Sequence, residues 1–592
     1  MKVYNVGILP IWGSTVGTLV REYAKWKYDV PLSSNTPANK YSGQLLNTEL
    51  NDNDFAILKS LQLTAKNTPS KVIFVDEDKQ YDAHKVMSNV KKVANGLKEM
   101  GIKQGDKVAI MALPNEIELY ESVFAIQALG AVPVLINFLN TPNIPYMFLK
   151  SDATTLIVGR HEKMQEGAEK LSKAGLLKNV VYVADTEPKT FMQSLFVPYS
   201  LLRDSQEEIP DEEIFHNMTS SYPALQLYTS GSEGRPKRMT YSYQMVNNLV
   251  KALDRFGINE NDKVILPVPF YHLAGLLVFC GALNYKVPIV LSEVPTRRYP
   301  PSIPKAVENI TSNNVTGLPG VPAILEPLLE SALKNNNLLP SLRLIFSGAA
   351  PLTKNLLALV DELNQRREIN GLSKIRLVNL YASTECGPIS SNVDEITPDK
   401  RSSVGFPFDN VEAKTSSSNE LLIKVPVFPP EISEDLFTEE GFFKTGDTID
   451  IVNGELIFRS RQTDRLNING EKIAPDTIQN EINKFPGIKD SYVFGVSKNE
   501  GDGSDLICAL VIPKNLTDES ITQANIRKFL MDNELLPPTL IPRVIFVEPE
   551  LPISLMGTTG KVTVKSLADK YGPIARSKYK RKLEGYRFGQ AA

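Results

Sequence analysis

The chain has 592 residues, 42% hydrophobic and 22% charged, which excludes wholesale disorder and exceeds what one hydrophobic core usually supports, so two or more domains are expected. Its 65 lysines and arginines nearly balance 68 aspartates and glutamates, and the net charge of −3 argues against a nucleic-acid partner. The three cysteines and four histidines show no disulfide or metal-ligand spacing, and no apolar run approaches the roughly 20 residues that span a bilayer.

Residues 1–55 show no sustained periodicity and are expected to form an irregular extension packed on the main body. Beyond them, short β-rich runs alternate with helical stretches, an order typical of a largely parallel sheet with crossover helices. A helix is expected at residues 116–129, where apolar side chains recur on one face and Gly130 supplies a stop. The expected strands are residues 107–113, 132–136, 155–158, 180–183, 263–266, 289–291, 342–346 and 375–380.

The pattern changes near residue 421 to shorter alternating segments, which predict antiparallel or barrel-like structure. From about residue 465, two helical and two strand-like runs predict a small α+β domain. The expected elements are strands at residues 420–425, 454–459, 507–512 and 543–547 and helices at residues 475–485 and 522–534. The predicted fold class is therefore α/β, with a large N-terminal domain of mixed sheets and flanking helices, a β-barrel-like subdomain, and a small C-terminal domain.

The run from Tyr228 to Lys237 reads Tyr-Thr-Ser-Gly-Ser-Glu-Gly-Arg-Pro-Lys and follows an expected strand at residues 224–228. Its glycines let backbone N–H groups surround an anion, its hydroxyls add donors, and its lysine supplies a point charge. Composition alone favours a surface turn, since Gly, Ser and Pro are common in turns. The spacing matches neither the Gly-x-x-x-x-Gly-Lys loop nor Gly-x-Gly-x-x-Gly nor Gly-x-Ser-x-Gly, which argues against kinase, GTPase, dehydrogenase and α/β-hydrolase functions.

The order of these residues resembles the signature loop of the adenylate-forming superfamily of acyl-CoA synthetases, peptide-synthetase adenylation domains and luciferases. Further motifs follow in the family's order, namely Phe270-Tyr271-His272, Ser347-Gly348-Ala349-Ala350-Pro351, Tyr381-Ala382-Ser383-Thr384-Glu385, Thr445-Gly446-Asp447, Ser460-Arg461 and Gly560-Lys561. The resemblance covers about residues 60–570 and indicates the acyl-CoA synthetase branch. It implies an N-terminal domain over residues 1–463 and a small mobile C-terminal domain over residues 464–592, with a hinge near Asp464.

The resemblance also implies a nucleotide site assembled from these motifs. Tyr381 would stack on adenine beside small side chains, and the two oxygens of Asp447 suit the vicinal hydroxyls of ribose. Glu385 is the expected Mg²⁺ ligand, because a hard cation prefers oxygen donors. The implied site residues are Thr229, Ser230, Gly231, Ser232, Gly234 and Lys237 for the phosphates, and Gly348, Ala349, Ala350, Tyr381, Ser383, Thr384, Asp447 and Arg461 for the base and ribose. Outside the motifs they would be ordinary turn, core or surface residues.

Other implied residues serve the acyl group and the thiol. Lys561 resembles the family's catalytic lysine, whose charge bridges the attacking carboxylate and the α-phosphate. His272 resembles a gate beside the acyl pocket, and Gly470 lies on the loop expected to line the thiol tunnel after a rotation about Asp464. With Glu385, Thr229 and Lys237, Lys561 and His272 complete the expected catalytic set. The alternatives are a buried structural histidine and a solvated lysine.

Four residues depart from the family's usual pattern. Glu233 stands where Thr or Ser is usual and brings a carboxylate near the expected phosphates. Arg238 replaces a usual Gly, Tyr243 a common His and Ala382 a usual Gly. A catalytically weakened AMP-binding paralogue with a regulatory role is therefore an alternative, although the expected catalytic residues are retained.

The sequence thus predicts an AMP-forming acid–thiol ligase that uses ATP, Mg²⁺ and coenzyme A to activate a fatty or other hydrophobic carboxylic acid. Transfer to a carrier-protein phosphopantetheine is the alternative, weakened because no Ser-centred carrier motif follows Lys561. The expected partner is a small-molecule acid, without nucleic acid or a transmembrane segment, while peripheral membrane contact and a carrier protein stay open. The scattered, odd cysteines favour a reducing, cytoplasmic location.

Overall fold

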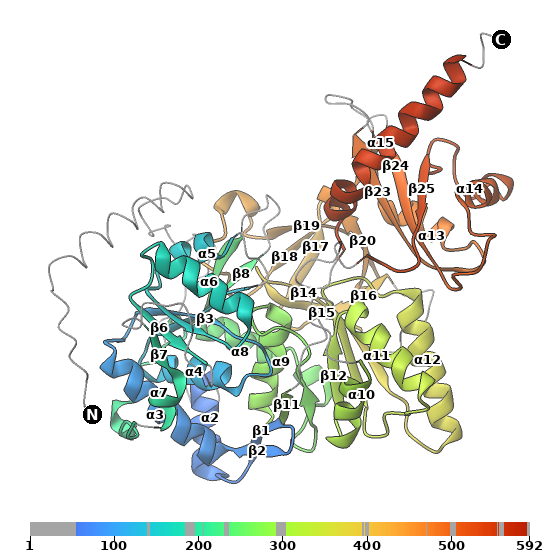
Figure 1. Ribbon diagram of the computed structural model, residues 1–592. Coiled ribbons are helices and arrows are strands. Elements are labelled where there is room, and N and C mark those ends of the chain that lie inside the picture. The colour runs from blue at the N-terminus through green and yellow to red at the C-terminus, as the bar shows by residue number, and fades with distance from the viewer. Residues whose placement is uncertain are drawn as a thin grey trace.

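A computed structural model of the protein, shown in Figure 1, describes most of the chain after residue 54. The described residues are 55–138, 143–183, 196–204, 206–229, 236–291, 303–392, 396, 402–468, 471–497, 505–552, 555 and 562–588. The extension expected at residues 1–55 therefore lies outside this part of the chain, apart from Phe55. Among the described helices, none is both long and apolar enough to cross a membrane.

A seven-stranded sheet with strand order β7-β6-β5-β3-β4-β8-β9 forms the first layer. Its neighbouring strands are parallel except for the β8–β9 hairpin. The inner strands read as continuous apolar runs because they are buried on both faces. The strands are β3 (Lys107–Met111), β4 (Val132–Leu135), β5 (Thr155–Val158), β6 (Asn179–Tyr182), β7 (Phe196–Pro198), β8 (Pro223–Thr229) and β9 (Lys237–Ser242).

A thirteen-stranded sheet forms the second layer, in the order β17-β18-β19-β20-β16-β15-β14-β13-β12-β10-β11-β1-β2. Strands β14 to β1 in this order are parallel, and both ends of the sheet are antiparallel. The strands are β1 (Val72–Asp76), β2 (Lys79–Asp82), β10 (Val264–Ile265), β11 (Ile289–Leu291), β12 (Gly317–Gly320), β13 (Leu344–Gly348), β14 (Arg376–Ser383), β15 (Gly387–Ser391), β16 (Ser403–Pro407), β17 (Glu412–Thr415), β18 (Glu420–Lys424), β19 (Phe443–Val452) and β20 (Glu455–Arg461). The segments expected to form a barrel-like subdomain are thus one end of this sheet, and the described strands close no barrel.

Alternate residues of the parallel strands pack into two different hydrophobic cores. Phe74 and Leu344 face the core shared with the seven-stranded sheet, whereas their neighbours Val75 and Ile345 face α10, α11 and α12. Because successive side chains of a strand point to opposite faces, this sheet is a layer between two sets of helices, and Figure 1 shows α9 on one side of β12 and α10–α12 on the other. The helices up to this point are α2 (Ile57–Asn67), α3 (Ala83–Glu99), α4 (Ile117–Ala128), α5 (Ile144–Ser151), α6 (Glu162–Lys173), α7 (Tyr199–Asp204), α8 (Tyr243–Lys251), α9 (Leu273–Asn284), α10 (Ile303–Ser312), α11 (Pro322–Lys334) and α12 (Lys354–Ile369).

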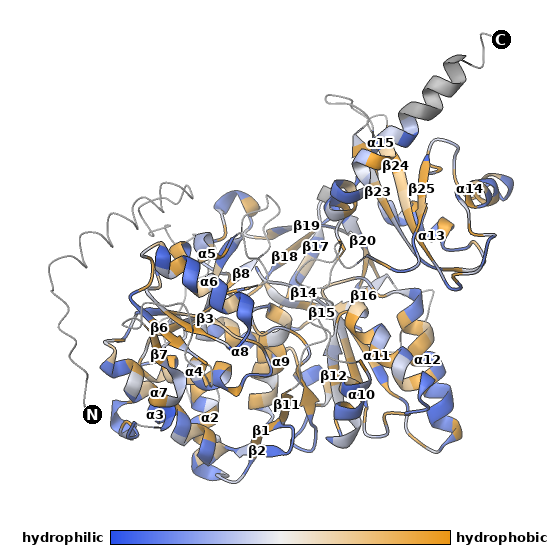
Figure 2. Cartoon of the chain, viewed as in Figure 1, coloured by the Kyte–Doolittle hydropathy of each residue, from blue (hydrophilic) through white to orange (hydrophobic). Residues whose placement is uncertain are grey.

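The residues after Asp464 form a small α+β unit whose two hydrophobic cores contain only residues from 466 onward. In Figure 2 strands β24 and β25 of this unit are largely hydrophobic, and helix α14 is largely hydrophilic. An ion pair between Lys489 Nζ and Glu330 Oε1, at 2.7 Å, joins this unit to α11. The domain boundary and hinge at Asp464 stay predictions. The elements are β21 (Leu466–Ile468), β22 (Glu471–Ile473), α13 (Pro475–Ile482), β23 (Ile488–Ser497), β24 (Asp505–Pro513), α14 (Gln523–Asp532), β25 (Val544–Val547) and α15 (Val564–Phe588).

Candidate active site

Asp447, Tyr381 and Arg461 come from three strands and meet at one point. Tyr381 Oη donates a hydrogen bond to Asp447 Oδ2 at 2.5 Å, and Arg461 Nε lies 2.9 Å from Asp447 Oδ1. Asp447 and Arg461 are partners across β19 and β20, so their contact follows from strand pairing. Strand β14, which carries Tyr381, is separated from β19 by β15, β16 and β20 in the sheet. The antiparallel end of the sheet therefore curves back over β14, as strongly twisted sheets do.

The environment of Asp447 leaves it able to accept a further hydrogen bond. The residue is only 3% exposed. Burial, together with the adjacent Asp447 carboxylate, raises the pKa of Tyr381 well above its usual value, so the phenol keeps its proton and acts as a donor. Asp447 Oδ1 accepts no aligned hydrogen bond from any described residue, although Arg461 lies close to it. A buried acceptor with spare capacity suits a hydroxyl group of a ligand.

The turn between β14 and β15 carries Ser383, Thr384 and Glu385, and a buried tyrosine holds it in place. Tyr241 Oη on β9 donates a hydrogen bond to the Thr384 carbonyl oxygen at 2.6 Å. Burial and the nearby Glu385 raise the pKa of Tyr241, so its hydroxyl stays a donor. Ser383 Oγ is buried without a hydrogen-bond partner among the described residues. The described residues contain no group of three or more His, Cys, Asp or Glu that would hold a metal ion by themselves.

The end of β13 places small residues directly beside this turn. Gly348 is the parallel partner of Leu380, the residue before Tyr381. A Cβ on Gly348 would lie 2.9 Å from the Leu380 carbonyl oxygen, so only glycine fits there. Ala349 adopts a φ of 60°, in the left-handed region, which turns the chain away at the strand end. The strand pairing thus brings the Ser-Gly-Ala-Ala motif next to the Tyr-Ala-Ser-Thr-Glu motif.

Thr229 and Lys237 are cross-strand partners at the loop end of the β8–β9 hairpin, where β8 ends and β9 begins. Strand β9 also carries Tyr241, so the hairpin and the Glu385 turn are tied together by the hydrogen bond to Thr384. Lys237 is exposed. The remaining predicted site residues, Ser230, Gly231, Ser232, Gly234, Gly470 and Lys561, lie outside the described residues.

His272 precedes α9 and lies in an apolar environment. Its Nε2 is buried without a hydrogen-bond partner among the described residues, and the Tyr271 ring meets it edge-on with centroids 4.7 Å apart. Burial lowers the pKa of His272 to about 4, because desolvation penalises the charged imidazolium. His272 is therefore neutral at physiological pH, with a free acceptor or donor nitrogen.

We expect His272 to make the protein sensitive to acid. Its pKa falls from the usual 6.5 to about 4 on folding, so the unfolded chain binds the proton more readily and stability drops as pH falls below 6.5. Between pH 7 and 5 the free energy of unfolding should fall by about 2 kcal/mol more in the wild type than in His272→Gln. Chemical denaturation at both pH values measures this, with His84→Asn, which changes an exposed histidine, as control. Equal pH dependence in wild type and His272→Gln would contradict it.

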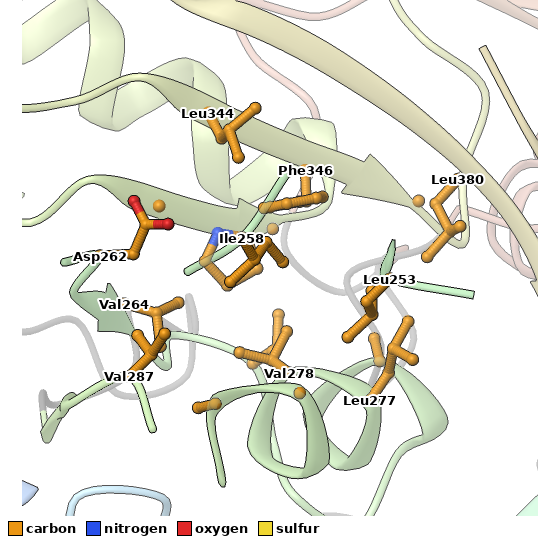
Figure 3. Close-up of a pocket in the computed structure, with 18 of the residues that line it drawn as sticks. Leu253, Ile258, Asp262, Val264, Leu277, Val278, Val287, Leu344, Phe346 and Leu380 are labelled. Atoms are coloured by element: carbon orange, nitrogen blue, oxygen red, sulfur yellow. The ribbon is translucent and has the colours of Figure 1, made fainter. Parts of the chain in front are cut away.

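An apolar pocket opens beside the motifs and extends beneath the thirteen-stranded sheet. It lies between α9 and strands β10, β12 and β13, with a volume of about 90 Å³ available to the centres of water molecules. Figure 3 shows Leu277 and Val278 on one wall and Leu344 and Phe346 on the other, with Leu380 and Asp262 at opposite ends. Ser347 and Gly348 line the end next to Leu380. The pocket therefore begins at the Ser-Gly-Ala-Ala motif and runs along β13.

Strand β12, which forms one wall of this pocket, was not expected from the sequence. Strand β12 is Gly-Leu-Pro-Gly, and its residues Gly317, Pro319 and Gly320 line the pocket. Glycine and proline are typical of turns, so local composition argues against a strand here. The one available signal was its place in the β–α alternation, after an amphipathic helix and before another.

Residues 61–422 match the family described as AMP-binding enzyme. The chain is 24% identical over 529 residues to 2-succinylbenzoate–CoA ligase of Listeria monocytogenes, covering 86% of this chain and 99% of the relative. It is 25% identical over 511 residues to 4-coumarate-CoA ligase 1 of Narcissus pseudonarcissus, covering 81% and 86%. The structure of O-succinylbenzoate coenzyme A synthetase from Bacillus subtilis, in complex with ATP and magnesium ion, has a TM-score of 0.68 at 22% identity, covering 86% of this chain and 99% of that one. The matched segment contains most of the clustered motifs, and this chain belongs to the AMP-binding, adenylate-forming enzyme family.

Proposed function

We propose that this protein is an acyl-CoA ligase that activates a hydrophobic carboxylic acid. The acid carboxylate attacks the α-phosphorus of ATP, the bond to pyrophosphate breaks, and coenzyme A then displaces AMP to give a thioester. The observation that carries the proposal is the junction of two features: the buried Asp447 carboxylate with Tyr381 and Arg461 beside it, and the apolar pocket that begins at Gly348. A polar nucleotide bound at Asp447 and an apolar acid bound in the pocket would meet at Gly348.

The chemistry requires positioning and charge neutralisation, because the carboxylate and ATP are both anions. Asp447 offers spare acceptor capacity for ribose hydroxyls, and Gly348 leaves room for a flat base against the backbone. Glu385 would hold Mg²⁺, which supplies charge neutralisation at the phosphates when bound. Thr229 and Lys237 would meet the phosphates from the hairpin end, and Lys561 would stabilise the negative charge that develops during attack.

The pocket supports a hydrophobic acid. Its lining is almost entirely apolar, and it follows β13 from Gly348 to Leu344, a length of about 13 Å for a strand of five residues. The relatives named above act on 2-succinylbenzoate and 4-coumarate, both aromatic acids. A fatty acid is one of the acids such a pocket would take, and an aryl acid with an extended side chain is another.

The two half-reactions need two arrangements of the residues after Asp464, because the thiol must reach the acyl carbonyl group beside which Lys561 would lie during adenylation. The separate hydrophobic cores support rotation of this unit as one body. Gly470 would then line the thiol path. Coenzyme A is the proposed acceptor because the relatives named above are CoA ligases.

The test is pyrophosphate release with ATP and Mg²⁺ across short, long and aromatic acids, with and without coenzyme A. We expect sustained release with coenzyme A and at most one turnover without it, since the acyl-adenylate then stays bound. A holo carrier protein replaces coenzyme A in a further arm. If none of the acids causes pyrophosphate release, the proposal is overturned in favour of a non-catalytic AMP-binding protein. If a thioester forms only on the carrier protein, coenzyme A is not the acceptor.

Gly317 should set the length of acid that the pocket takes. A Cβ there would make only ordinary contacts, 3.7 Å from Val264 and 4.0 Å from Phe346, and the larger side chain of valine would occupy part of the pocket that Gly317 lines. Gly317→Val should lower kcat/KM for the longest accepted acid by roughly tenfold or more, while shorter acids keep theirs. Gly572→Ala, whose Cβ also meets ordinary contacts but lies in α15, is the control. An unchanged length profile would exclude this pocket as the acyl site.

A further inference from the structure

We propose that Glu431 and Arg238 act as a clamp that positions the β8–β9 hairpin, so that Thr229 and Lys237 meet the phosphates of ATP. The inference rests on the function proposed above and names positioning residues for it. Arg238 is one of the departures from the family's usual pattern, where glycine is common. Glu431 lies in the segment between β18 and β19.

The Glu431 carboxylate receives three hydrogen bonds from the hairpin. Arg238 Nε donates to Oε1 at 3.1 Å, the Thr240 backbone N–H donates to Oε2 at 3.0 Å, and Thr240 Oγ1 donates to Oε1 at 2.5 Å. The side chains of Arg238 and Glu431 are 18% and 12% exposed. Partly buried, charge-assisted hydrogen bonds of this kind are stronger than exposed ion pairs. The clamp therefore holds the side chain and the backbone of β9 at once.

The same face of the hairpin is also fastened to α5. The second arm of the Arg238 guanidinium, Nη1, donates to the Lys150 carbonyl oxygen at 2.8 Å. Tyr228, the cross-strand partner of Arg238, donates to the Met147 carbonyl oxygen at 2.6 Å. Glu431 and α5 thus hold Tyr228, Arg238 and Thr240 from one side, directly beside the last rung of the hairpin, which pairs Thr229 with Lys237.

Strand alternation separates this fastened face from the face that meets the active site. Successive side chains point to opposite faces, so Arg238 and Thr240 share the clamp face, whereas Lys237 and Tyr241 share the other. Tyr241 contacts the Thr384 carbonyl oxygen beside Glu385, which identifies that other face as the active-site face. The guanidinium of Arg238 therefore lies on the face opposite Lys237, and it positions the phosphate-binding end without touching it.

The clamp also links two parts of the candidate site that are distant in sequence. Glu431 precedes β19, which carries Asp447, whereas Arg238 follows Lys237 directly. Loss of the clamp should loosen the hairpin relative to Asp447. Binding of the phosphates should weaken, and binding of the adenosine portion should persist.

The experiment compares binding of Mg²⁺-ATP and of AMP to the full-length protein by calorimetry, with KM and kcat for ATP measured alongside. Glu431→Gln should raise Kd and KM for ATP roughly tenfold and leave Kd for AMP within about twofold, since only the β- and γ-phosphates lose alignment. Glu440→Gln is the matched control, because Glu440 lies in the same segment and pairs with Lys414 at the surface. A merely structural role would lower thermal stability and weaken ATP and AMP binding equally, which would overturn the clamp.

Arg238→Ala provides an independent variant should Glu431→Gln fold poorly. It should show the same preferential loss of ATP affinity, and the double variant should lose less than the sum of the two single losses, because the two variants share the Arg238–Glu431 contact. Additive effects, or an Arg238→Ala protein with wild-type ATP affinity, would contradict the proposal. If the wild type itself fails to bind ATP, the proposed function is wrong. If the wild type and both variants bind ATP equally well, only the clamp proposal is wrong.

Discussion

Asp447→Asn should lower kcat/KM for ATP by about 100-fold. The substitution keeps the shape of the side chain but removes the charge that Tyr381 and Arg461 now share, and it removes a carboxylate acceptor for the ribose hydroxyls. Hydrogen bonds to charged groups contribute roughly 1.5–3 kcal/mol each, which corresponds to a loss of about one to two powers of ten per bond. Arg461 would also be left beside a neutral amide, so its charge loses its partner.

The measurement is steady-state pyrophosphate release at varied ATP, with Kd for AMP measured separately. The variant should show a lower kcat/KM for ATP and a higher Kd for AMP, because the ribose is common to ATP and AMP. Asp450→Asn is the matched control, since Asp450 lies three residues further along β19 and pairs with Arg459 at 2.7 Å, but at the surface. Equal behaviour of the two variants would show that Asp447 holds no ribose.

Glu385→Gln should reduce the rate of adenylate formation by about 10³-fold at saturating ATP and leave AMP binding nearly unchanged. A carboxylate ligand fixes a metal ion at the phosphates, and such a metal contributes several kcal/mol of charge stabilisation in the transition state. The neutral amide of glutamine is a poorer ligand, so the Mg²⁺ concentration for half-maximal rate should also rise. The turn itself should stay in place, because Tyr241 holds it through the Thr384 carbonyl oxygen rather than through Glu385.

Single-turnover formation of acyl-adenylate across a Mg²⁺ titration measures both effects. Glu412→Gln, which changes an exposed glutamate on β17, controls for the loss of one negative charge. Wild-type Mg²⁺ dependence in Glu385→Gln would assign the metal to another ligand. Weakened AMP binding in the same variant would instead indicate that Glu385 shapes the ribose pocket.

Many secondary-structure elements followed from local sequence. The strands expected at residues 155–158 and 289–291 occur with those bounds as β5 and β11, and the helix expected at residues 116–129 occurs as α4, Ile117–Ala128. Short apolar runs between polar turns carry this information locally, because a strand buried on both faces tolerates few polar residues. Strand β12 was missed because its glycines and proline are selected by the neighbouring strands and the pocket, which the segment itself does not reveal.

Part of the candidate site could likewise be predicted from the sequence, and part of it could not. Motif order identified Tyr381, Asp447 and Arg461 as residues of one site, and the structure places them in contact. The order of the motifs did not indicate that the Tyr381 hydroxyl would donate a hydrogen bond to Asp447. Nor did it show that Arg238 would lie on the clamp face and pair with Glu431, 193 positions away.

The sequence by itself determined the family, the α/β alternation and the residue types at each motif. Chemistry at an anion requires glycines, hydroxyls, carboxylates and cations, and the order of the motifs along the chain resembles that of the family. The tertiary structure alone decided which of those groups touch, how the antiparallel strands that it describes continue the large sheet instead of closing a barrel, and where the apolar pocket begins. Contacts between strands distant in the chain depend on sheet curvature and on packing around a shared core. Such information is spread over the whole chain, and no single segment contains it.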